Sequence, residues 1–348
     1  MRDAAAARPV WIHSPGLDLP LLILSPLVGV AMVLSQVATG KMWAPLAVSY
    51  LVGIPHYLST LTFYMGDDNR GHYRARWPAF FMGPLLIVAA VLSLRLAGIH
   101  APVLAAIFVW NIFHVARQSA GILSIYRRLN RGPECERIPA HRAILAVNAT
   151  MAVWNIEAFA PLNDAFVAIH ASIPGLLRAA GVVASLVTLA QLGLARRKRT
   201  EPISFPEGAF LLTSLLLFHP YLWVEDSGLA TLGMLTGHFF QYLAMVWLVH
   251  RRKYGVHPGG SAAQRLLGRI SSHGTVLLGA IVASGLLLYA FTKVTEAMGA
   301  NMAYIIVWNT MVLIHFYLDG LIWAFRNPFV RASLGPYVGP VTARELAP

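Results

Sequence analysis

Residues 301–326 read NMAYIIVWNTMVLIHFYLDGLIWAFR, a run that is long and apolar enough to cross a bilayer as one helix. His315 and Asp319 lie within this run, four residues apart, so they share one face of the helix. A histidine and a carboxylate are costly to hold inside hydrocarbon and usually serve a function there. The segment therefore predicts both a membrane helix and a functional site inside the membrane.

The composition extends the membrane prediction to the whole chain. Of its 348 residues, 57% are hydrophobic and 12% are charged, whereas soluble domains carry about 25% charged residues. Apolar runs of about 20 residues predict ten spans in a single all-α helical bundle. These spans cover 19–39, 43–65, 78–98, 101–127, 139–160, 174–196, 206–226, 229–250, 273–292 and 300–325.

Basic residues follow every second predicted span, and the other connections are nearly neutral. Loops rich in Lys and Arg stay on the cytoplasmic side of a membrane, so we expect both termini to be cytoplasmic and the location to be a bacterial inner membrane. The formal net charge of +12 then implies no nucleic acid, and membrane lipids are the expected surroundings. We predict a cytoplasmic segment at 1–18, one transmembrane domain at 19–326 and a cytoplasmic tail at 327–348.

Four of the thirteen histidines lie inside predicted spans at a similar depth: His56, His114, His238 and His315. Each precedes the predicted cytoplasmic end of its helix by about 10–13 residues, or ~15–20 Å along the axis. Neutral imidazoles bind iron, copper or zinc, and Cys135 is the only cysteine, so no thiolate cluster can take this role. The pattern predicts one metal site near mid-membrane. Separate hydrogen-bonded packing roles for the histidines are the alternative.

A polar residue follows each of these histidines by one helical turn, a spacing at which its side chain can orient the imidazole. These residues are Thr60, Arg117 with Gln118, Gln241 with Tyr242, and Asp319. All of them except Thr60 and Gln118 are expected to support catalysis. Arg117 is expected to pair with Asp319, because a cation inside a membrane needs a counter-charge.

Short motifs surround the four histidines: Gly53-Ile54-Pro55-His56, Phe113-His114, Gly237-His238-Phe239, and Ile314-His315 followed by Asp319 and Ile322-Trp323-Ala324-Phe325-Arg326. Together they resemble the bacteriorhodopsin-related-protein/Blh family of membrane β-carotene 15,15′-dioxygenases. The resemblance implies non-haem Fe(II) held by histidines, and cleavage of a carotenoid into retinal with molecular oxygen as co-substrate.

We therefore expect an iron-dependent oxygenase whose lipophilic, unsaturated substrate reaches the site from the bilayer. His219, which precedes Pro220 at a similar depth, is expected to face the substrate or to add a ligand. The aromatic residues expected to line the substrate cavity are Trp110, Phe239, Phe240 and Tyr317.

Two other functions remain open on the residues alone. The first is electron transfer through haem b, with two of the histidines as axial ligands. The second is proton-coupled transport, with His315, Asp319 and Arg117 as a relay. The chain lacks the P-loop, the nucleophile elbow and the dinucleotide-binding glycine motif, which disfavours those enzyme classes.

Overall fold

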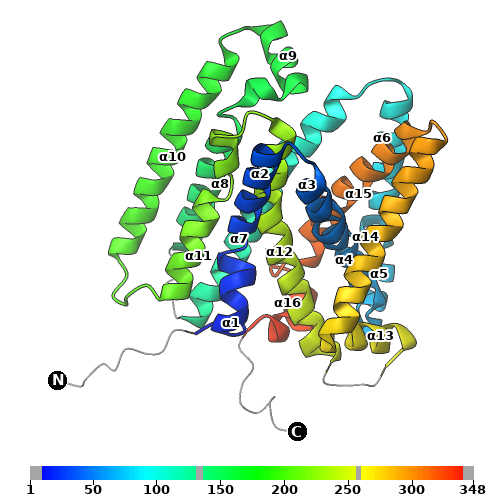
Figure 1. Ribbon diagram of the computed structural model, residues 1–348. Helices are drawn as coiled ribbons and strands as arrows, with labels where there is room; N and C mark the ends of the chain where they lie inside the picture. The colour runs from blue at the N-terminus through cyan, green and yellow to red at the C-terminus, as the bar shows by residue number, and fades with distance from the viewer. Residues whose placement is uncertain (1–9, 131–135, 256–259, 340–348) are drawn as a thin grey trace.

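The computed structural model describes residues 10–130, 136–255 and 260–339, and every regular element in these ranges is a helix (Figure 1). The long helices run beside one another as a bundle, and short helices gather at its two ends (Figure 1). The predicted all-α bundle is therefore confirmed.

The elements follow one another along the chain as α-helices interrupted by short π and 3-10 turns, which carry the label η. They are α1 (Pro15–Asp18), η1 (Leu19–Ile23), α2 (Pro26–Thr39), α3 (Trp43–Val48), η2 (Ser49–Gly53), α4 (Ile54–Ser59), η3 (Thr60–Met65), α5 (Asp67–Ala75), η4 (Pro78–Met82), α6 (Gly83–Leu96), α7 (Ala101–Leu129), α8 (Arg137–Ala152), η6 (Ile156–Ala158), α9 (Ala160–Ile169), α10 (Ile173–Arg197), α11 (Phe205–Leu216), η7 (His219–Leu222), α12 (Ser227–Tyr254), α13 (Ala262–Ser272), α14 (Gly274–Ala297), α15 (Asn301–Ile322), α16 (Pro328–Leu334) and η8 (Gly335–Tyr337).

Within the described residues, seven helical runs are long and apolar enough to cross a membrane. They are Trp43–Met65, Pro78–Leu96, Ala101–Leu129, Ile173–Arg197, Ser227–Tyr254, Gly274–Ala297 and Ile305–Ile322. An eighth results if the helices before and after a 49° bend at residues 24–25 are counted together. The predicted count of ten is not confirmed, because α8 and α11 have only 16 and 12 residues, while a full crossing needs about 20.

Helix α11 ends inside the predicted span 206–226 because of a proline. Pro220 has no N–H to offer the carbonyl of Leu216, four residues before it, and the chain continues as the short 3-10 helix η7. Ring nitrogen Nδ1 of His219 lies 2.8 Å from that carbonyl. Asn148 of α8 accepts a hydrogen bond of 3.3 Å from the N–H of Phe218. The side chains of His219 and Asn148 thus satisfy backbone groups that the end of α11 would otherwise leave without hydrogen bonds.

Helix α12 is the central helix of the bundle. Of its most apolar stretch, 67% is buried by other parts of the chain, against 6% for α10 and for α14. Helix α2 crosses α12 at Gly29 and Gly233, where a side chain on Gly29 would strike the carbonyl of Gly233. Small residues permit such close contact between membrane helices. Helices α10 and α14 instead turn most of their apolar side chains outward, as lipid-facing helices do.

Both ends of the described chain meet at one end of the bundle. Near the end of α12, Nη2 of Arg252 donates to the carbonyl of Ile12 at 2.9 Å, and Nη1 donates to the carbonyl of Tyr337 at 3.1 Å. Helices α1, α5, α13 and α16 lie at this end, as does the connection between α10 and α11 (Figure 1). We call it the basic end, because these segments include several of the basic groups that the sequence places after alternate spans.

Candidate metal centre

Four helices contribute one histidine each to a buried cluster: His56 from α4, His114 from α7, His238 from α12 and His315 from α15. One ring nitrogen from each lies within 4.8 Å of those of the other three. Neighbouring ring centroids are 4.3 Å apart for His56 and His315 and 5.0 Å apart for His114 and His238. At most 7% of any of these residues is exposed. The structure thus brings together the four histidines that the sequence singles out.

The turn before His56 is wider than a normal α-helical turn. The hydrogen bond that closes η2 spans five residues instead of four, and Pro55, which has no N–H, follows at the start of α4. Such π turns are frequent at functional sites. At the end of η2, Gly53 leaves room for α12, since a side-chain carbon there would lie 3.0 Å from the ring of Phe239. The Phe239 ring consequently packs 4.7 Å from the ring of His56.

Six of the eight imidazole nitrogens in the cluster are buried and have no hydrogen-bond partner. They are both nitrogens of His56, both nitrogens of His238, Nε2 of His114 and Nε2 of His315. A buried polar atom without a partner costs about 1–3 kcal/mol, and native proteins contain few of them. Neutral imidazole nitrogens are also suitable ligands for iron, copper or zinc. The cluster therefore has the donor atoms, the spacing and the exclusion of water that a metal ion requires.

Hydrogen bonds around His315 determine which of its nitrogens faces the cluster. Tyr242 donates its hydroxyl proton to Oδ1 of Asp319 at 2.6 Å, and Thr60 donates to the same oxygen at 3.2 Å. Because the one hydroxyl proton of Thr60 is used in this way, its oxygen accepts from Nδ1 of His315, 2.7 Å away. Nε2 of His315 is then the unprotonated nitrogen, and its lone pair is available to a metal.

Asp319 lies beside the cluster. Its Oδ2 is 3.7 Å from Nε2 of His315 and 3.9 Å from Nε2 of His114. The indole N–H of Trp323 donates to the Tyr242 hydroxyl at 3.3 Å and so extends the same network. Asp319 and Tyr242, both named from the sequence, are thereby connected to the cluster, and the carboxylate is placed to offset positive charge there.

The other predicted polar support on α12 points elsewhere. Nε2 of Gln241 donates to the carbonyl of Leu22 in η1 at 2.9 Å, so the expected contact of Gln241 with the cluster is wrong. Gln241 and Tyr242 are neighbours on α12, and the rotation of that helix turns Tyr242 toward α15 and Gln241 toward η1. On α7, Gln118 donates to the carbonyl of His238 at 3.3 Å.

Arg117 does not pair with Asp319, and that expectation is also wrong. The Arg117 side chain is exposed, and its guanidinium carbon lies 6.0 Å from the centre of the Phe113 ring. Phe113 and Arg117 are four residues apart and share the outward face of α7, whereas His114 faces inward. Asp319 is held instead by Thr60 and Tyr242.

Three residues expected at the substrate lie away from the cluster. His219 caps the end of α11 and lies beside Trp223, with ring centroids 6.1 Å apart. The phenol of Tyr317 occupies the space that a side chain at Gly83 of α6 would take. Phe240 is half-buried and has no ring contact with the four histidines in the described part of the chain. Tyr317 and Phe240 each stand two residues after a clustered histidine, which turns them to the opposite face of the helix.

Besides Tyr242, whose ring centroid lies 4.6 Å from that of His56, three aromatic residues that surround the cluster stand directly after a histidine. The ring centroid of Phe316 lies 4.5 Å from that of His114, and the ring centroid of Tyr57 lies 5.3 Å from that of His315. With Phe239, they follow three of the four histidines in the sequence. That recurrence was the signal for Phe316 and Tyr57, which reasoning from the sequence missed. Trp110 reaches only this outer layer, with its ring 6.1 Å from that of Phe316.

Thr60 is the other residue that sequence reasoning misplaced. It follows His56 by one turn, yet its hydroxyl contacts His315 on another helix.

No protein-family model, no curated protein and no solved structure matches this chain, so its likeness to the carotenoid dioxygenases rests on the short motifs around the four histidines alone.

Proposed function

We propose that His56, His114, His238 and His315 bind one iron ion, and that the chain is a membrane-embedded non-haem oxygenase for a lipophilic, unsaturated substrate of carotenoid type. The main support for the metal site is the group of six buried imidazole nitrogens that have no hydrogen-bond partners. Isolated packing histidines would each have a partner. In this cluster the nitrogens have one another as neighbours, and a shared cation gives them all a favourable contact.

The spacing supports a single ion. Metal–imidazole bonds are about 2.0–2.1 Å long, so two nitrogens on opposite sides of one ion lie roughly 4 Å apart. The selected nitrogens here lie within 4.8 Å of one another, and small side-chain rotations bring them onto one centre. Imidazole ligands suit iron, copper or zinc. Among these metals we choose iron, because the motifs around the four histidines resemble those of the dioxygenases.

Iron supplies the chemistry of molecular oxygen when bound, and the residues of the chain supply the surroundings. Phe239 and Phe316 pack against the imidazoles at 4.7 and 4.5 Å, which keeps the site apolar and dry. Asp319 contributes a negative charge next to two of the ligands. An oily substrate is the partner suited to such a site. We place it in a bacterial inner membrane, with the basic end in the cytoplasm.

Haem b is a poorer match to this geometry. Two axial imidazoles must leave room between them for a flat macrocycle, which extends well beyond the iron on every side. The four rings here form a continuous group with neighbouring centroids 4.3–5.0 Å apart. A macrocycle between any two of them would therefore collide with the other two.

The transport alternative loses one of its three proposed groups. Arg117 is exposed on the outer face of α7, so it cannot exchange protons or charge with His315 and Asp319 inside the bundle. The remaining pair is explained by the hydrogen bonds that orient His315.

Metal analysis with a visible spectrum tests the metal site. We expect about one iron per chain after expression with added iron and no Soret band. Single alanine variants of the four clustered histidines should lose most of the iron. His219→Ala, a membrane histidine outside the cluster, should retain it. Iron loading that is unchanged in all four variants would refute the proposed metal site, and with it the proposed oxygenase function.

Product analysis then tests the reaction. Wild-type protein loaded with iron, in detergent with β-carotene and air, should consume oxygen and release retinal. A chain that binds iron yet leaves the carotenoid and several other polyenes intact would refute the assigned substrate class, while the metal site would stand.

A further inference from the structure

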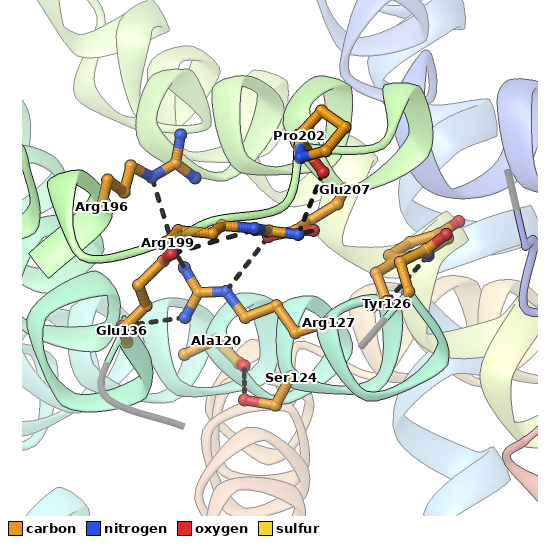
Figure 2. A network of polar contacts seen from close by, with 10 residues as sticks. Ala120, Ser124, Tyr126, Arg127, Glu136, Arg196, Arg199, Pro202 and Glu207 are labelled. Atoms are coloured by element: carbon orange, nitrogen blue, oxygen red, sulfur yellow. Dashed lines mark hydrogen bonds and ion pairs between the residues drawn. The ribbon is translucent and has the colours of Figure 1, made fainter. Parts of the chain in front are cut away.

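Five charged residues meet at the basic end, where α7, α8, α10 and α11 come together (Figure 2). They are Arg127, Glu136, Arg196, Arg199 and Glu207. Both glutamates are fully buried. With three arginines against two glutamates, the group carries one positive charge in excess. This group lies outside the histidine cluster, and the proposed oxygenase chemistry does not use it.

Each glutamate already has a close arginine partner. Arg199 donates Nη1 and Nη2 to the two oxygens of Glu207 at 2.7 and 3.0 Å, a two-pronged pairing. The hydrogen bond to Glu207 raises the pKa of the Arg199 guanidinium above its ordinary value. Arg127 donates to the backbone carbonyl of Glu136 at 2.8 Å and to its Oε2 at 3.3 Å. Oε1 of Glu136 has no hydrogen bond and lies 3.9 Å from Nη1 of Arg199. Together with the 3.5 Å contact between Arg127 and Glu207, these pairs link α7, α8 and α11.

Arg196 is the cation in excess. Its only ionic contact in this group joins Nε to Oε2 of Glu136 at 3.5 Å, an oxygen that Arg127 already occupies. Nη2 of Arg196 is buried and has no hydrogen-bond partner, while 23% of the side chain is exposed. In Figure 2 the dashed line from Arg196 starts at Nε, and none starts at its terminal nitrogens. A guanidinium edge with free donors suits an anion with several oxygens.

The surface that leads to Arg196 is apolar. Helix α10 ends at Arg197, and Val182, Leu186 and Leu189, which lie within about 80° of Arg196 around the helix, are exposed by 39–64%. Such a flank inside a membrane is covered by acyl chains. A molecule that lies along it and ends at Arg196 has a hydrophobic body and an anionic head.

We propose that Arg196 binds the phosphate of an anionic phospholipid whose acyl chains lie along α10. The fork of Nη1 and Nη2 matches two phosphate oxygens, and the excess charge of the group favours an anion over a zwitterion. Basic sites between membrane helices bind acidic headgroups in this way. A lipid is chosen over free phosphate because the apolar flank of α10 runs directly to the guanidinium.

Binding can be measured on the full chain in lipid nanodiscs of phosphatidylcholine containing a small fraction of phosphatidylglycerol, with the retained lipid counted by mass spectrometry. Arg196→Gln should lower the apparent affinity for phosphatidylglycerol about tenfold, or about 1.4 kcal/mol. Arg197→Gln is the matched control, because it removes the same charge from the adjacent, exposed position. It should change the affinity less than twofold.

An equal loss in the two variants would overturn the site and leave only general attraction to the basic end. Displacement of phosphatidylglycerol by millimolar inorganic phosphate would assign the site to free phosphate and would also overturn the lipid. If Arg196→Gln does not fold, Arg196→Lys decides the question, because it keeps the charge and loses the fork. Lipid retention equal to that of wild type in Arg196→Lys would then refute two-pronged binding.

Discussion

Replacing Thr60 with valine tests how the chain orients a candidate ligand. The Thr60 hydroxyl is the hydrogen-bond partner of His315 Nδ1, at 2.7 Å, and valine has nearly the same shape without the hydroxyl. The change also removes the contacts of the Thr60 hydroxyl with Tyr242 at 2.7 Å and with Asp319 at 3.2 Å. Tyr242 and Asp319 keep their mutual bond of 2.6 Å, so the nitrogen of His315 is the atom left buried without a partner. That loss corresponds to about 1–3 kcal/mol. Loss of a group that orients a metal ligand lowers metal affinity about 10–100-fold.

The assay is a titration of the iron-loaded protein with a competing chelator, combined with thermal unfolding of the metal-free protein. Thr62→Val is a close control. Thr62 lies on the same short helix, η3, and its hydroxyl is 2.6 Å from Nε2 of His250, a buried histidine outside the cluster. It should lower stability by a similar amount and leave metal affinity unchanged. Equal metal affinities in the two variants would refute the role assigned to Thr60.

Three more changes separate local roles. His219→Ala should lower the free energy of unfolding by about 1 kcal/mol, since it removes a hydrogen bond at the end of α11; thermal unfolding measures this, and loss of bound iron as well would contradict its placement. Gly53→Ala forces Phe239 to shift and should destabilise the chain by about 1–3 kcal/mol, with altered substrate turnover; an unchanged melting temperature would show that the ring yields freely. Partial burial lowers the pKa of His72, which stacks on Phe329 at 3.8 Å. Its neutral form is therefore favoured in the folded chain, and its stabilisation is present above the unfolded pKa of about 6.5 and is lost as the pH falls below it. His72→Phe should remove that part of the pH dependence of thermal unfolding, and an unaltered profile would contradict the assignment.

The residues of the cluster could be named from the sequence because burying them in a membrane is costly. Four histidines at one depth, on four separate apolar runs, have few explanations besides a shared site. The same physics predicts the all-helical bundle, since a helix satisfies its own backbone in lipid. These features depend on composition along each segment, which a sequence displays directly.

The contacts between helices could not be predicted in the same way. Spacing places Thr60 on the same face as His56, yet the rotation of its helix directs the hydroxyl to His315. Arg117 lies four residues after Phe113, which faces outward, and three residues after His114, which faces inward. Its position along the helix allows either direction, and the side chain turns outward. The predicted number of spans is not confirmed for a related reason, because an apolar run does not reveal where a helix such as α11 stops.

The histidine cluster also implies an order of assembly. Its members come from α4, α7, α12 and α15, and a chain is made from its N-terminus onward. Until α15 is synthesised and inserted, the chain contains only three of the four clustered histidines. Tyr242 and Thr60 then also lack the carboxylate of Asp319, to which they donate. A ribosome stalled before residue 301 would therefore hold a nascent chain with an incomplete cluster, which only the last of these four helices completes.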